Sequence, residues 1–267
     1  MSLIGNLFTS SIGRKFLMAV SGVILVGFVI GHLVGNLQIF SHPDKINGYA
    51  EFLHGLGPLL WVARIVLIIA VAVHIWAAAV LTIENRRARG HAGYGAKNTI
   101  RATLSSRTMR LTGVVVLAFI VYHLLHFTLG GVQKEAFKEN LPRYTMTADY
   151  HVAGIPVVKQ GAQVGDVHSM VVYGFQNVTV SVFYIIAVGL LSFHLVHGVD
   201  SMFQTLGWRN HTWATGLRRV AVVFALGYFL ANAAIPLAII AGKVQLREGA
   251  QPAALAAAAA TATPSTR

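Results

Sequence analysis

The sequence contains no cysteine. Without thiols the chain forms no disulfide, ligates no iron–sulfur cluster and attaches no c-type haem, although non-covalent cofactors remain open. Charged residues are also scarce. Asp, Glu, Lys and Arg make up 11% of the 267 residues, whereas hydrophobic residues make up 55%. A soluble domain carries about 25% charged residues. The composition therefore indicates a membrane protein.

Five long stretches contain no charged residue at all. A helix needs about 20 apolar residues to cross a bilayer, and within lipid only helices and closed barrels satisfy their backbone groups. The apolar residues are continuous rather than alternating, which excludes a barrel. The sequence therefore predicts an all-α membrane protein, a bundle of five transmembrane helices. The uncharged stretches are residues 16–43, 65–83, 111–133, 167–199 and 220–242.

The chain is expected to form one transmembrane domain over residues 1–245, followed by a low-complexity tail over residues 246–267. The first uncharged stretch is too long for the apolar core of a signal peptide, and no small-residue cleavage site follows it. We therefore expect this stretch to remain as a membrane anchor. The expected helices span approximately residues 14–38, 59–84, 109–131, 170–204 and 217–241.

Acidic residues are outnumbered, 9 against 21 basic ones, and the basic residues gather in three segments. These are the N-terminus with Arg14 and Lys15, the segment from Glu84 to Arg110, and the segment before the fifth helix. The positive-inside rule places all three on the cytoplasmic side, so the N-terminus is expected inside and the C-terminus outside. Because the basic residues flank membrane spans without a recognition motif, nucleic-acid binding is not expected.

One histidine lies in each of the first four expected helices: His32, His74, His123 and His194. At 1.5 Å rise per residue, His32 and His123 lie nearer the outer surface and form an outer pair, whereas His74 and His194 form an inner pair. Two histidines at one depth can bind an iron from both faces of a porphyrin, which leaves no open position and suits electron transfer. The two depths therefore predict two b-type haems stacked across the membrane.

Other interpretations of these histidines remain open on sequence alone. A single intramembrane histidine can serve as a hydrogen-bonding group instead, and zinc is a weaker option because its ligands cluster at one point. His126 and His197 each follow a candidate ligand by three residues, on nearly the same helix face, so either could be the true ligand. Gly31, beside His32 in a stripe of glycines, would admit a flat ring or simply another helix.

Six segments carry a resemblance to a known family. Taken together they resemble the single-chain, five-helix, dihaem cytochrome b subunit of succinate:quinone oxidoreductases, the respiratory complex II family that includes succinate dehydrogenase and fumarate reductase. The similarity covers about residues 10–210. The segments are "SSIGRKFLMAVSG", "IGHLVGNLQIF", "FLHGLGPLLW", "RTMRLTG", "VYHLLHFTLG" and "LSFHLVHGVDSMFQTLG".

The resemblance implies a role for each histidine. It assigns His32 and His123 to a distal haem near the outer surface, and the inner pair to a proximal haem near the cytoplasmic subunits. The family's glycine four residues after the fourth ligand matches Gly198, which follows His194. His126 and His197 then become neighbours of the haems rather than ligands.

The resemblance also implies partners, since such a chain does not oxidise succinate by itself. It would anchor a flavoprotein with covalent flavin and an iron–sulfur subunit to the cytoplasmic side of a bacterial inner membrane, as the non-flavin part of a tricarboxylic acid cycle and respiratory chain enzyme. It would carry electrons to a quinone, expected to be menaquinone, and the complex could form a higher oligomer. Arg14 and Arg110 could neutralise haem propionates, meet the iron–sulfur subunit, or act only as topology signals.

The quinone site is expected near the outer start of the second helix, where some relatives place an acidic residue. The segment "INGYAEFLHGLGP" offers Glu51 and His54 there, although Glu51 could also be an exposed loop acid. A fumarate reductase relative has a glutamate two residues before the ligand of the fourth helix. This chain has Ser192 at that place, so that proton route is not expected.

Three rival functions are compatible with parts of the pattern. A fumarate reductase would run the same anchor in reverse, and the dihaem cytochrome b of a hydrogenase or formate dehydrogenase also pairs histidines across helices. A haem-free transporter could use histidines as proton relays, but it would be expected to show inverted repeats and broken helices. Only Pro236 interrupts a span here, and the histidines of the first two helices repeat in the next two. For His151 and His168, in the outer loop 131–170, the sequence offers no role beyond surface polarity or a lid.

Overall fold

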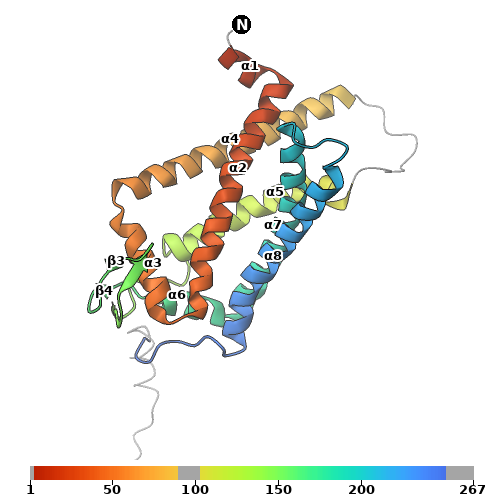
Figure 1. Cartoon of the computed structure of the whole chain (residues 1–267). Helices are drawn as coiled ribbons and strands as arrows, with labels where there is room; N and C mark the ends of the chain where they lie inside the picture. The colour runs from red at the N-terminus through yellow and green to blue at the C-terminus, as the bar shows by residue number, and fades with distance from the viewer. Residues whose placement is uncertain (1–2, 90–102, 251–267) are drawn as a thin grey trace, which may run out of the picture. The chain divides into compact units, whose positions relative to one another are not determined.

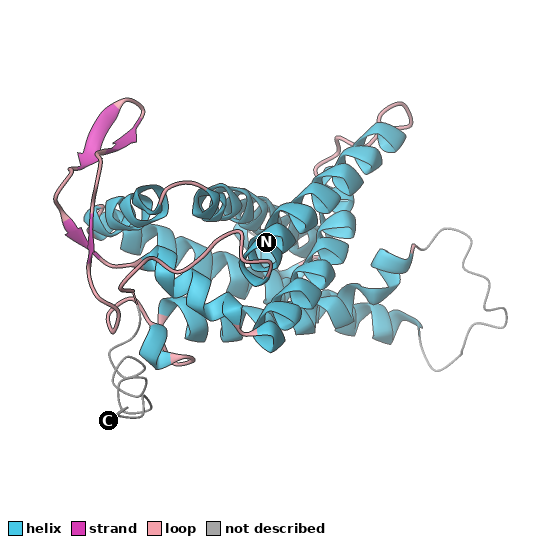
Figure 2. Ribbon diagram, turned by 90° about the horizontal axis from the view of Figure 1, so that it is seen from below, coloured by secondary structure: helices cyan, strands magenta, loops and turns pink. Residues whose placement is uncertain are grey.

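The computed structural model describes residues 3–89 and 103–250, and these are mainly helical (Figure 2). Figure 1 follows the helices in chain order. The helices are α1 (Leu3–Thr9), α2 (Ser11–Asn36), α3 (Pro43–Gly55), α4 (Pro58–Arg89), α5 (Leu104–His123), α6 (Val167–Gln176), α7 (Val178–Thr205) and α8 (Ala214–Ile240). Three short helical segments are η1 (Leu37–Phe40), η2 (Leu124–Thr128) and η3 (Lys134–Ala136), and the strands are β1 (Tyr144–Thr145), β2 (Tyr150–Val152), β3 (Ile155–Val158) and β4 (Gln163–Val164).

Five helices are long and apolar enough to cross a membrane, which confirms the expected number of spans. They cover Ser11–Phe40, Pro58–Ala88, Leu104–Thr128, Val178–Thr205 and Ala214–Ile240. The stretch expected as one helix over 170–204 forms two, because Asn177 has an extended ψ of 109° between α6 and α7. Much of the expected basic loop, and residues 251–267 of the expected tail, lie outside the described residues.

The chain divides into two compact units, each described here by itself. Unit 1 comprises Met1–Gly31, Trp61–Gly113 and Leu191–Tyr228, and unit 2 comprises His32–Leu60, Val114–Leu190 and Phe229–Arg267. Each unit contains a part of each of the five long helices. The inner pair of histidines belongs to unit 1 and the outer pair to unit 2.

The connection between the first two spans, in unit 2, folds into α3. Pro43 at its first position presets the helical φ, and the side chain of His42 caps the free N–H of Asp44. The buried Asp44 carboxylate accepts hydrogen bonds from the Thr147 hydroxyl (2.5 Å), the Thr147 N–H (2.8 Å) and the Tyr144 hydroxyl (3.0 Å). Burial alone would raise the pKa of Asp44, but these hydrogen bonds outweigh it and lower that pKa. They fasten the strand segment onto α3.

Two small antiparallel pairs, β1–β4 and β2–β3, fold over α3 in the same unit. Val152 pairs with Ile155 around a tight turn in which Ala153 and Gly154 have φ of 50° and 82°. The side chains that this sheet buries include Met146 and Val164, each 1% exposed. An apolar core thus lies under the hairpins, outside the candidate spans.

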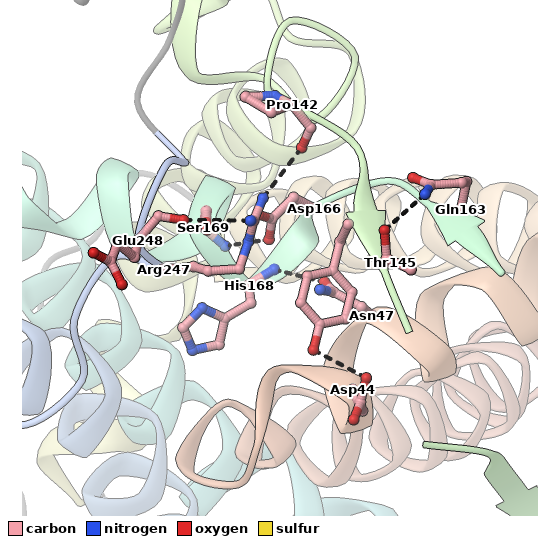
Figure 3. A network of polar contacts seen from close by, with 11 residues as sticks. Asp44, Asn47, Pro142, Thr145, Gln163, Asp166, His168, Ser169, Arg247 and Glu248 are labelled. Carbon is pink, nitrogen blue, oxygen red and sulfur yellow. Dashed lines mark hydrogen bonds and ion pairs between the residues drawn. The ribbon is translucent and has the colours of Figure 1, made fainter. Parts of the chain in front are cut away.

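A polar network joins the end of the described chain to α6. Asp166 is fully buried, caps α6 by accepting from the Ser169 N–H (2.9 Å), and forms an ion pair with Arg247 at 3.0 Å. Figure 3 shows Arg247 reaching Asp166 while the backbone of His168 contacts Asn47. His168 is 5% exposed, so it lies in the interior rather than serving surface polarity.

Candidate cofactor site

The inner pair meets between α4 and α7. The ring centroids of His74 and His194 lie 6.4 Å apart. A Cβ built on Gly22 would lie 3.7 Å from Cε1 of His74, and one on Gly113 would lie 3.5 Å from Cε1 of His194. Each imidazole therefore rests against the backbone of a neighbouring helix, at a position where no side chain intervenes.

The outer pair meets between α2 and the end of α5. The ring centroids of His32 and His123 lie 5.7 Å apart and the ring planes are nearly perpendicular, at 86°. Phe119, Phe127 and Tyr184 surround His123 with ring centroids 5.9 to 6.0 Å away. This aromatic wall screens one side of the pair from lipid and water.

The two pairs fit a haem iron bound on both faces. With the zinc–imidazole bond of about 2.0–2.1 Å as a guide, two such bonds in line place the ring centres about 6.3 Å apart. The inner pair, at 6.4 Å, matches that value, and the outer pair, at 5.7 Å, is somewhat closer. Among residues 3–89 and 103–250, no group of three or more His, Cys, Asp or Glu side chains could hold a bare metal ion. Each pair instead offers two ligands, the number that a porphyrin leaves open on its iron.

One ring nitrogen of the outer pair lacks a partner within the described part of the chain. Nδ1 of His123 is buried there without a hydrogen bond. A buried donor or acceptor without a partner costs free energy.

His126 differs from His123 because the helix changes its pitch between them. Residues 124–128 form a π-helical turn, with the Leu129 N–H donating to the Leu124 carbonyl at 2.8 Å. His126 is 3% exposed, and its Nδ1 lies 2.9 Å from the Tyr184 hydroxyl while its Nε2 lies 3.0 Å from Oε1 of Gln133. Both nitrogens are occupied, so His126 is a hydrogen-bonding neighbour of the outer pair.

His197 lies in a regular part of α7, half-buried, one turn from the inner-pair residue His194. It interacts electrostatically with Asp200 and His194. Asp200 in turn pairs with Arg209 at 3.5 Å. The structure therefore places His197 beside the inner pair but brings no second histidine ring face to face with it.

The glycine stripe of α2 divides into open and covered positions. A Cβ on Gly27 or Gly31 would meet no atom within 4 Å in the part of the chain that the structure describes, so no described side chain packs against these two positions. A Cβ on Gly35 would lie 2.5 Å from the ring of Tyr49, so a side chain there would require that ring to move. The open part leaves room for a flat group beside α2.

The two expected arginines have different environments. Arg14 forms an ion pair with Glu84, and its Nε donates to the Phe8 carbonyl at 2.8 Å. The Ser11 hydroxyl also donates to Glu84, at 3.3 Å. Arg14 therefore ties α2 to α4, whereas Arg110 on α5 is exposed.

The two candidate quinone residues lie on α3. Glu51 is exposed and lines a cavity of about 380 Å³ together with Phe52, Leu56 and residues 157–159 and 162–164. His54 faces elsewhere: its Nδ1 donates to the Ala50 carbonyl at 2.7 Å, and its Nε2 accepts from Nζ of Lys138 at 3.2 Å. The structure thus brings Glu51, but not His54, to the wall of a cavity.

Two residues of the site have no role in the sequence-based prediction. Ser21 and Thr112 each place a hydroxyl oxygen 3.3 Å from Nδ1 of an inner-pair histidine. The signal that could have found them is a repeated hydroxyl–glycine dipeptide, "SG" at 21–22 and "TG" at 112–113, each on the candidate membrane span before the one that carries the inner-pair histidine.

No family model, curated protein or solved structure matches the chain.

Proposed function

We propose that this chain is the membrane-anchor and electron-transfer subunit of a succinate:quinone oxidoreductase, with two b-type haems, one held by His32 and His123 and the other by His74 and His194. The observation that supports the proposal best is the meeting of four intramembrane histidines in two cross-helix pairs, 5.7 Å and 6.4 Å apart. When bound, a haem of this kind supplies one-electron transfer without an open coordination position.

The residues of the chain would perform the remaining tasks. The paired imidazoles orient and electronically tune the iron, and the apolar helices exclude water from it. The basic inner segments keep the N-terminus cytoplasmic and present Arg110 to an iron–sulfur subunit that, with a flavoprotein, would dock there. This would make the chain the non-flavin subunit of the enzyme in a bacterial inner membrane.

The quinone, which we propose to be menaquinone, would bind near α3. The cavity lined by Glu51 measures about 380 Å³, within the range of about 300–1,000 Å³ typical of small-molecule sites. Glu51 could exchange a proton with the quinone head group at its wall. Both ring nitrogens of His54 already have partners, the Ala50 carbonyl and Lys138. His54 would therefore influence the quinone only through Lys138.

Purification of the tagged chain from its native membranes in mild detergent tests this function. We expect covalent flavin, non-haem iron and succinate-dependent quinone reduction to co-purify with it. In membranes carrying His74→Ala, quinone reduction should be lost while succinate oxidation by a soluble dye persists. A haem-containing chain that brings neither flavin nor iron would contradict the complex II assignment and favour another dihaem cytochrome b.

A further inference from the structure

Two helices of unit 1 present the same device to the inner pair. On α2 the dipeptide Ser21–Gly22 faces His74, and on α5 the dipeptide Thr112–Gly113 faces His194. In both cases the hydroxyl oxygen lies 3.3 Å from Nδ1 of the histidine. The repetition, on different helices with different hydroxyl residues, indicates a role in holding the imidazoles.

The direction of the first hydrogen bond follows from the partners of Ser21. Its Oγ lies 2.8 Å from the carbonyl oxygen of Leu17 and 3.1 Å from that of Met18, one turn earlier on α2. Carbonyl oxygens only accept, so the single hydroxyl proton is directed to the helix itself. The lone pairs of Oγ are then left to accept from Nδ1–H of His74, in the tautomer that carries its proton there. The backbone carbonyl of Met18 also hydrogen-bonds to this imidazole.

Thr112 repeats this arrangement on α5. Its Oγ1 lies 3.1 Å from the carbonyl oxygens of both Thr108 and Met109. The hydroxyl proton is again used within the helix, and Nδ1 of His194 becomes the donor. Ser21 and Thr112 are 3% and 4% exposed, so water does not compete for either bond.

We infer that Ser21 and Thr112 are positioning residues for the inner pair. By accepting from Nδ1–H, each hydroxyl selects the imidazole tautomer in which Nε2 bears the lone pair that can bind iron. It also fixes the orientation of the ring and makes the imidazole a stronger electron donor. Because tuning requires a bound haem, this role rests on the function proposed above.

Both hydroxyls lie at Nδ1 of an inner-pair histidine. In the outer pair, Nδ1 of His123 has no partner among the described residues. Ser21 and Thr112 therefore act on the redox properties of the inner-pair haem, which makes the inference testable by the selectivity of its effects.

Loss of a hydroxyl should raise the midpoint potential of the inner-pair haem. The carbonyls of Met18 and Met109 also hydrogen-bond to the two imidazoles, so each substitution removes one acceptor of two. The imidazole then donates less charge to the iron, and ferric iron loses stability relative to ferrous iron. We expect a change of severalfold, up to tenfold, in the one-electron reduction equilibrium, where tenfold corresponds to about 59 mV.

The experiment is a spectroscopic redox titration of the purified, haem-loaded chain. The component lost in His74→Ala is first assigned to the inner pair. Ser21→Ala and Thr112→Val, the second nearly isosteric, remove the hydroxyls, whereas Ser21→Thr and Thr112→Ser retain them. Ser192→Ala is the matched control, because Ser192 is a buried hydroxyl on α7 whose Oγ contacts no histidine.

We expect Ser21→Ala and Thr112→Val to raise the potential of the inner component alone, and the hydroxyl-retaining variants and Ser192→Ala to leave both potentials at the wild-type values. Unchanged potentials in both hydroxyl-free variants, or equal shifts of both components, would overturn the inference while the haem content upheld the proposed function. If a hydroxyl-free variant fails to load haem, failure of its hydroxyl-retaining counterpart to restore the wild-type spectrum would overturn the inference. A wild-type chain without haem would refute the proposed function itself.

Discussion

Three histidines of this chain differ in the hydrogen bonding of their ring nitrogens. At His74 the Ser21 hydroxyl lies at Nδ1, which leaves Nε2 as the nitrogen that would bind iron in the proposed function. His126 has a partner at both nitrogens, so it holds the aromatic wall beside the outer pair. His168, outside the spans, has a buried Nδ1 with no partner among the described residues. Partners at both nitrogens distinguish His126 from the candidate ligand His123, whose Nδ1 has none among the described residues.

Because of His168, the stability of the segment that contains α6 should decrease in acid. Burial lowers the pKa of His168 below its usual 6.5; Asp166 partly opposes this, whereas His42 and Arg247 lower the pKa further. As pH falls below 6.5, the unfolded segment takes up the proton before the folded one, so stability present above pH 6.5 decreases. Hydrogen exchange should therefore show weaker protection of α6 at pH 5.5 than at pH 7.5, after correction for intrinsic rates.

His168→Gln removes the titrating group and should flatten this difference. His151→Gln, on the exposed part of β2, serves as the control and should retain it. Two results would show that another group controls the acid response. One is stronger hydrogen-exchange protection of α6 at pH 5.5 than at pH 7.5, and the other is an equal loss of protection in the wild type and in His168→Gln.

At the scale of elements, the membrane spans could be predicted from the sequence because a membrane helix is apolar along its whole length. The break at Asn177 was not, since the stretch 167–199 lacks charge on both sides of it. The π-helical turn at 124–128 was also unreadable, because it is defined by backbone hydrogen bonds that any apolar sequence can form. The sequence could therefore not decide between His123 and His126 by spacing alone.

The packing of α3 against β2 depends on a glycine. A Cβ on Gly48 would lie 2.6 Å from Cβ of Tyr150, an atom close to the backbone that cannot swing away. Gly48→Ala should cost about 1–3 kcal/mol through overpacking, seen as a lower denaturation temperature and faster proteolysis near residues 150–158. Gly55→Ala, on the same helix with nothing within 4 Å, should be neutral or slightly stabilising. Equal denaturation temperatures of the two variants would mean that β2 does not pack tightly against α3 at Gly48.

The ion pair of Asp166 and Arg247 fastens the end of the described chain to α6. Asp166 is 0% and Arg247 27% exposed, so Arg247→Gln should cost about 3 kcal/mol, the lower end for breaking a buried pair. The double variant Asp166→Asn/Arg247→Gln should lose less free energy of unfolding than Arg247→Gln alone, because it leaves no unpaired buried charge. Lys243→Gln, an exposed change of equal charge in the same segment, is the control. Thermal unfolding that ranks Lys243→Gln with Arg247→Gln would show that net charge rather than the pair matters.

At the scale of the whole molecule, each histidine pair falls within its own compact unit. The sequence predicted which histidines pair, since depth along each helix follows from a fixed rise per residue, and the structure brings those same rings together. The sequence did not predict the contacts of Ser21 and Thr112 with the inner pair. It also did not predict that the strands β1 to β4 pack over α3. Both depend on contacts between segments far apart in the chain, such as Asp44 with Thr147.

The most direct test of the account is the haem content of the purified chain, determined as the pyridine haemochrome. We expect two b-type haems per wild-type chain, one after His32→Ala and one after His74→Ala, with two retained in His126→Gln. Different absorption components should disappear in the two alanine variants. A folded, haem-supplied chain that binds no haem, or single variants that each retain both, would contradict the two-pair arrangement.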